Sequence, residues 1–63
     1  RVLARRSVAA LREILKGEKL TGENVGLRRP GKGLAPSRYE SVLGKTAARR
    51  IARGALLKGG DFR

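Results

Sequence analysis

Short apolar runs separated by glycines set the pattern of this chain. The first run, residues 7–11 (SVAAL), is short and built of small residues, which predicts a buried strand. A helix is the alternative, because apolar residues recur at helical spacing: Val8, Leu11, Ile14 and Leu15. Lys16 and Gly17 then break the pattern, since glycine permits the positive φ that a sharp reversal requires. We predict a turn here, with Leu20 returning to the interior.

The middle of the chain combines a capped turn with a basic extended stretch. Thr21 is a suitable cap for a single turn, which neighbouring glycines predict to be 3-10. Residues 25–29 (VGLRR) are predicted to be extended, because Pro30 disfavours helical backbone at Arg29. Two nearby glycines permit a tight loop: Gly31 and Gly33.

Residues 35–44 carry the strongest helical pattern. Pro36 suits the first helical position and Gly44 suits the position after the last turn. Three side chains share one face: Tyr39, Val42 and Leu43. We expect only two turns.

Two segments 37 positions apart resemble each other. The matched pairs are Ile14/Ile51, Lys16/Arg53, Gly17/Gly54, Leu20/Leu57, Asn24/Asp61 and Val25/Phe62. Such self-similarity is typical of a repeated supersecondary unit, although coincidence between two similar turns is the alternative. We predict one domain over residues 1–63, with repeat arms at about 7–25 and 44–62 and a connector at 26–43.

The predicted fold class is a mostly β, small single domain with an internal pseudo-twofold repeat. It contains short strands, one short α-helix and 3-10 turns, and neither arm buries its apolar face alone. The predicted core is Ile14, Leu20, Val25, Leu27, Leu34, Val42, Leu43, Ile51, Leu56 and Leu57.

Composition argues against an enzyme that works by itself. There is no cysteine and no histidine, and the five acidic residues are scattered. A self-contained metal site or a histidine-based acid–base pair is therefore not expected. The net charge of +11 predicts attraction to polyanions or to acidic protein surfaces. A basic, solvated surface that faces acidic surface in a larger protein is the simplest interpretation.

Nothing in the sequence indicates membrane insertion or secretion. No apolar run approaches the ~20 residues that span a bilayer, and the basic N-terminus is not followed by a long apolar stretch. We expect a cytoplasmic protein. The absence of an initial methionine suggests a piece of something longer.

The order and spacing of several motifs resemble the C-terminal domain of sialic acid synthases. This antifreeze-like or SAF domain has a β-clip fold and is related to type III antifreeze proteins. The resemblance extends from about Arg6 to Phe62. It rests on residues 6–10 (RSVAA), 14–18 (ILKGE), 20–24 (LTGEN), 29–33 (RPGKG), Tyr39 and 43–45 (LGK). Synthases of N-acetylneuraminate, legionaminate and pseudaminate are not separated by these motifs.

The resemblance implies a role in another subunit's active site. In that family a barrel domain, holding a divalent metal, condenses phosphoenolpyruvate with an N-acetylhexosamine. The SAF domain lies over the barrel of the other subunit in a homodimer and supplies an arginine to the sugar. By motif this substrate-binding residue is Arg29, with Pro30 and Gly31 shaping its loop. The domain itself is implied to hold no cofactor or metal and no catalytic residue. A solvated surface cation is the alternative for Arg29.

Two other functions remain open at this stage. Ice binding is suggested by the antifreeze relatives, on a surface built from residues 17–19 and 21–24 with Arg12 and Thr46 nearby. Its charged groups would oppose adsorption, because their desolvation is costly. Non-specific nucleic-acid binding through the net charge is the other alternative. It predicts that the affinity for nucleic acid falls steeply with salt concentration. Against it, the sequence has only two aromatic residues, which provide no platform for stacking the bases of a single strand.

Overall fold

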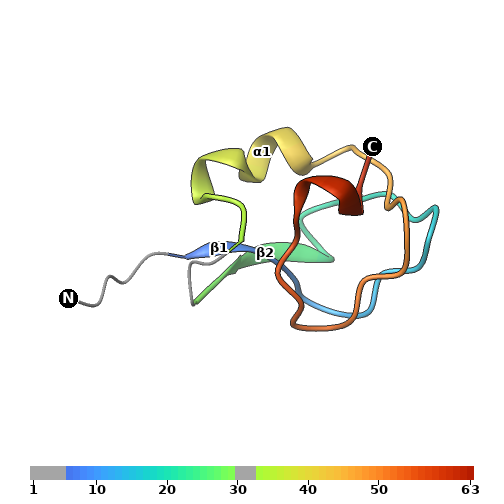
Figure 1. Cartoon of the computed structure of the whole chain (residues 1–63), viewed down its shortest axis with the longest axis horizontal. Helices are drawn as coiled ribbons and strands as arrows, with labels where there is room; N and C mark the ends of the chain where they lie inside the picture. Colours follow the sequence, from blue (N-terminus) through green and yellow to red (C-terminus); the bar gives the residue numbers. More distant parts are fainter. Residues whose placement is uncertain (1–5, 30–32) are drawn as a thin grey trace.

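The computed structural model describes residues 6–29 and 33–63. Its regular elements are, in chain order, strands β1 (Ser7–Ala10) and β2 (Val25–Arg28), 3-10 helix η1 (Pro36–Arg38), helix α1 (Tyr39–Val42) and 3-10 helix η2 (Gly59–Asp61). Figure 1 shows β1 beside β2, with η1 and α1 on one side of the pair. Short strands, one short α-helix and 3-10 turns confirm the predicted fold class.

Strand β1 is the centre of the molecule. It pairs antiparallel with β2, from Ser7 opposite Arg28 to Ala10 opposite Val25. All four of its residues are buried, which explains why the run is built of small side chains. Its other edge is also occupied, since the Leu57 N–H donates to the Val8 carbonyl (2.9 Å). The strand prediction was therefore right, and the helical spacing was incidental.

The 37-residue repeat is present in the backbone hydrogen bonds. Gly17 N–H donates to the Ala47 carbonyl (2.8 Å), and 37 positions later Gly54 N–H donates to the Ala10 carbonyl (2.9 Å). The donors of the two bonds, Gly17 and Gly54, are repeat partners, and so are the acceptors, Ala47 and Ala10. Gly17 and Gly54 both have positive φ, 89° and 83°, as a tight reversal demands.

The pseudo-twofold axis passes between Ile14 and Ile51. These two residues are repeat partners, and each donates its N–H to the other's carbonyl at 2.8 Å. The side chains of Glu13 and Arg50, also repeat partners, form an ion pair beside them. A residue pairs with its own equivalent only at a twofold axis, so the internal symmetry is a property of the fold. We retain the arm boundaries at 7–25 and 44–62 as a proposal.

Residues 35–44 contain the predicted helical segment, but it consists of a 3-10 helix followed by an α-helix. Pro36 begins the 3-10 helix η1, and α1 follows it directly. Gly44 has a φ of 89°, which reverses the chain after the last turn. Val42 is fully buried, and Tyr39 and Leu43 pack half-buried against the core.

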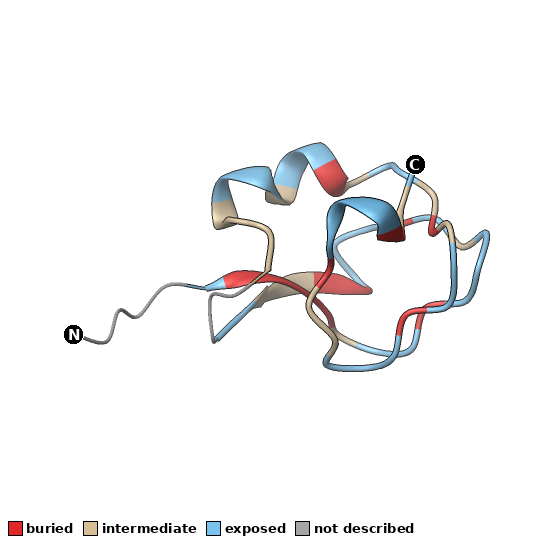
Figure 2. Ribbon diagram, viewed as in Figure 1, coloured by how far each residue is buried: buried red, intermediate tan, exposed pale blue. Residues whose placement is uncertain are grey.

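The observed core overlaps only in part with the predicted one. Six of the ten predicted residues are buried: Ile14, Leu20, Val25, Val42, Ile51 and Leu57. Leu27, Leu34 and Leu43 are half-buried and pack against them. Leu56 was wrongly placed in the core, because adjacent residues of an extended segment face opposite sides and Leu57 takes the inward one. Figure 2 shows buried positions along β1 and where the arms cross.

Small and polar residues complete the interior. Ala47 is fully buried where the arms meet, and Asn24 and Asp61 are buried at 1% and 3% exposure. Every buried side-chain N or O atom of the described residues has a hydrogen-bond partner. Within residues 6–29 and 33–63, no helix has the length and apolar character needed to cross a bilayer.

Candidate functional site

Arg29 directly follows the last residue of β2 and is exposed. Its side chain makes no hydrogen bond or ion pair with any residue in the described ranges. Arg28 differs, because its Nη1 donates to the carbonyl of Leu27 (2.8 Å). Pro30 and Gly31, predicted to shape the loop, lie outside the described residues. Among residues 6–29 and 33–63, Arg29 therefore has no polar partner.

The chain is anchored on both sides of residues 30–32. Before them, Arg28 lies opposite Ser7 in the sheet. After them, the Val8 N–H donates to the Leu34 carbonyl (3.1 Å). Gly33 approaches the arm so closely that an added Cβ would lie 3.0 Å from Cβ of Leu56. These contacts hold the ends of the loop against the centre of the domain, and Arg29 is at one end.

Three arginines surround a surface hollow of about 330 Å³ beside Arg29. We call it the arginine hollow; its lining residues are Ala10, Leu11, Arg28, Arg29, Arg53 and Gly54. No carboxylate lines it. The sequence singled out Arg29 and treated Arg28 as a surface charge. The structure brings both to one concave site.

Arg53 is the site residue that sequence reasoning missed. It is 24 positions from Arg29 in the chain and was assigned only to a turn. Its repeat partner Lys16 gave no indication of a site. The turn at Gly54, which carries Arg53, is hydrogen-bonded to Ala10 on the edge of β1 opposite β2, and Arg53 lines the hollow from that side.

A second hollow, of about 500 Å³, lies on the other side of the same turn. Its lining residues are Arg49, Arg50, Ile51, Ala52, Ala55, Leu56, Lys58 and Asp61. Here the arginines already have partners. Arg49 pairs with Asp61 (2.6 Å) and Arg50 pairs with Glu13. These charges are therefore partly compensated inside the chain, unlike those of the arginine hollow.

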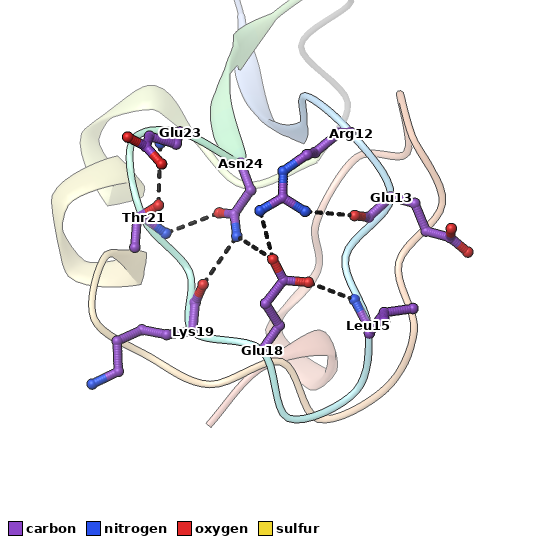
Figure 3. Close-up of polar contacts among 8 residues, drawn as sticks. All are labelled: Arg12, Glu13, Leu15, Glu18, Lys19, Thr21, Glu23 and Asn24. Carbon is purple, nitrogen blue, oxygen red and sulfur yellow. Dashed lines mark hydrogen bonds and ion pairs between the residues drawn. The ribbon is translucent and has the colours of Figure 1, made fainter.

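A polar network occupies the surface, built from residues 17–19 and 21–24, that was considered above for ice binding (Figure 3). Glu18 is at its centre. Its Oε1 accepts from the Leu15 N–H (2.9 Å), and its Oε2 accepts from Nη2 of Arg12 (2.6 Å). Asn24 closes the network: its Oδ1 accepts from the Thr21 N–H (2.9 Å) and its Nδ2 donates to the Lys19 carbonyl (2.9 Å). These groups join three parts of the first arm, which is a structural role.

The network lowers the pKa of Glu18. The Leu15 N–H contributes most, followed by the hydrogen bond from Arg12, and together they hold the pKa below the usual value of 4.5. A lowered folded-state pKa stabilises the fold above the ordinary glutamate range. That contribution is lost as the pH falls through the lower, folded-state pKa.

We expect Glu18→Gln to remove this part of the acid dependence. The melting temperature of wild type should exceed that of the variant at pH 7, and the difference should shrink below about pH 4.5. Thermal unfolding followed by circular dichroism from pH 7 to acid measures it. Glu40→Gln removes a carboxylate outside the network and is the charge-matched control. A Glu18→Gln difference that stays constant with pH would contradict the assignment.

The divalent metal that the resemblance implies has no ligands in the described part of the chain. No group of three or more Asp, Glu, His or Cys side chains gathers within residues 6–29 and 33–63. The sequence itself has neither histidine nor cysteine.

The relatives of this chain are larger proteins that make acidic sugars. It is 48% identical over 62 residues to a pseudaminic acid synthase of Campylobacter jejuni, covering 98% of this chain and 18% of that protein. It is 35% identical over 57 residues to an N,N'-diacetyllegionaminic acid synthase of Legionella pneumophila, covering 90% and 16%. The chain thus spans less than a fifth of the length of these relatives.

A solved structure and a family model agree with these relatives. The crystal structure of a spore coat polysaccharide biosynthesis protein E from Chromobacterium violaceum matches with a TM-score of 0.77 and 31% identity, over 94% of this chain and 18% of that one. The model of the SAF domain matches residues 5–63. With nearly its whole length matched in sequence and fold, this short chain belongs to the SAF domain family.

Proposed function

We propose that this chain is the substrate-capping SAF domain of a sugar acid synthase. The observation that carries the proposal is the 48% identity to a pseudaminic acid synthase along 98% of the chain. The condensation of phosphoenolpyruvate with an N-acetylhexosamine then belongs to a barrel domain, as does the divalent metal. Such a synthase works in the cytoplasm.

Arg29 acts on the sugar in the barrel of the other subunit of a homodimer. Three observations support this role: its side chain is exposed, it has no partner within the described ranges, and the backbone is anchored on both sides of its loop. A guanidinium presents a planar fork of donors, which suits oriented hydrogen bonds to a carbonyl or hydroxyl oxygen. The net charge of +11 favours docking on an acidic barrel rim.

Arg29→Ala in the full synthase that carries this domain tests the proposal. Losing a hydrogen bond from a charged donor costs about 1.5–3 kcal/mol, so kcat/KM for the sugar should fall about ten- to one-hundred-fold. The melting temperature should change little, because the side chain is exposed and forms no hydrogen bond or ion pair with residues 6–29 and 33–63. Steady-state kinetics at varied sugar concentration measures the effect.

Two further variants separate the role of the group from its charge. Lys16→Ala removes an exposed cation from the first arm and should leave the kinetics unchanged. Arg29→Lys keeps the charge without the planar fork and should recover only part of the rate. If Arg29→Ala has the kinetics of wild type, the role assigned to Arg29 is wrong.

A further inference from the structure

The arginine hollow has more positive charge than the neighbouring side chains compensate. Three of the five carboxylates in the sequence are engaged elsewhere, since Glu13, Glu18 and Asp61 pair with Arg50, Arg12 and Arg49. None of these acids lines the hollow. Neighbouring guanidinium groups repel one another, and an anion placed among them relieves that repulsion. An incoming anion therefore meets no competing carboxylate in the lining.

The backbone holds two of the arginines in fixed places. Arg53 lies in a tight turn in which the Ala55 N–H donates to the Ala52 carbonyl (3.0 Å). The following residue, Gly54, donates its N–H to Ala10 of β1 (2.9 Å). Arg29 continues directly from β2, the partner strand of β1. Both side chains thus start from segments hydrogen-bonded to one central strand, which reduces the entropy lost when they bind a common ligand.

The arginine hollow lies at the turn of the second arm, although the turns of the two arms are equivalent. The repeat partner of Arg53 is Lys16, whose turn is hydrogen-bonded to Ala47 in the same manner. Lys16 is not among the residues that line the arginine hollow. Arg28, the last residue of β2, and Arg29, which follows it, line the hollow together with Arg53 of the second turn. The difference between the arms is thus the end of β2, where Arg28 and Arg29 lie.

We propose that the arginine hollow binds an oxyanion, a carboxylate or a phosphate, with Arg29 and Arg53 as its ligands. The inference deepens the proposed function and rests on it in one respect: Arg29 serves both the sugar site and the anion. Guanidinium groups bind both anions in bidentate geometry, and two of them on different segments define its position. Arg28, held by its bond to the Leu27 carbonyl, adds charge at the edge.

Titration of the 63-residue chain with inorganic phosphate, and separately with acetate, tests this by NMR. We expect saturable shifts of the Leu11 and Gly54 amides and of the Nε–H groups of Arg29 and Arg53. Removing one charge-assisted contact at an exposed site should weaken binding about three- to tenfold in Arg53→Gln. Lys16→Gln makes the same change in net charge at the equivalent turn and should leave the affinity unchanged. Tighter binding of phosphate or of acetate identifies which oxyanion the hollow prefers.

Three outcomes would overturn the inference: no saturable binding of either anion, shifts spread evenly over all arginines, or equal effects of Arg53→Gln and Lys16→Gln. Each is distinct from a failure of the proposed function, which is measured by the sugar kinetics of Arg29→Ala. An intact anion site with unchanged Arg29→Ala kinetics would reject the sugar contact and keep the hollow. Altered kinetics without anion binding would do the reverse.

Discussion

Replacing Leu57 with alanine is expected to lower the free energy of unfolding by about 2–5 kcal/mol. The side chain is fully buried and belongs to the central hydrophobic cluster. Its backbone N–H also bonds to Val8 of β1, so the segment has little freedom to collapse into the cavity. A domain of this length has about 3–9 kcal/mol of stability in all, so the variant should lose a large share of its stability.

Urea unfolding followed by far-UV circular dichroism measures this loss. Leu20, the repeat partner of Leu57, is equally buried, and Leu20→Ala should cost a similar amount. Leu57→Val removes one methylene, costs about 1 kcal/mol and keeps the measurement possible if the alanine variant does not fold. Leu15 is 58% exposed, and Leu15→Ala should stay within about 0.5 kcal/mol of wild type. A cost for Leu57→Ala no larger than that for Leu15→Ala would reject the assigned core.

Replacing Asp61 with alanine is expected to cost about 1.5–3 kcal/mol. Asp61 is 3% exposed, and its Oδ2 accepts from the Lys58 N–H (2.9 Å) at the start of η2. Its Oδ1 accepts from Nε of Arg49 (2.6 Å). Alanine removes the cap of η2 and the ion pair together, and it leaves a small gap in the interior.

Asp61→Asn separates these two contributions. In the other arm Asn24 is the repeat partner, and its Oδ1 accepts from the Thr21 N–H (2.9 Å) as Asp61 accepts from Lys58. Asparagine should therefore preserve the cap and lose only the ion pair with Arg49, whose side chain is 67% exposed, at a cost below about 1 kcal/mol. Chemical denaturation of both variants gives the comparison. An Asp61→Asn variant as unstable as Asp61→Ala would show that the charge, and not the cap, holds this turn.

Local sequence features predicted much of this fold correctly. The small apolar run at 7–11 is a strand, and the stretch that precedes Pro30 is extended. Pro36 and Gly44 bound the helical segment as expected, because one restricts φ to helical values and the other permits positive φ. The 37-residue offset was visible because a repeated backbone needs glycine and apolar residues at repeated places. All these features depend on residues close together in the chain.

The errors arose where distant segments compete for space. Leu56 and Leu57 are adjacent residues of the same type, so the sequence does not distinguish them. Only the pairing of this segment with β1 buries Leu57 and leaves Leu56 half-buried. Ala47 was missed because its small side chain carries little hydrophobic signal, yet it lies where the arms come closest. Asn24 and Asp61 were recognised as repeat partners but not as buried caps, since burial of a polar residue depends on partners supplied by the fold.

The candidate site divides in the same way. Arg29 could be chosen from the sequence because residues 29–33 (RPGKG) match a motif of the family that the chain resembles, and a motif is a local feature. Arg53 could not, because its place beside the hollow depends on the turn at Gly54 docking on the edge of β1 opposite β2, a contact between residues far apart in the chain. Charge, turns and the repeat are properties of the chain itself. Which of its cations share a hollow, and which are paired with carboxylates, was decided only when the two arms packed around β1.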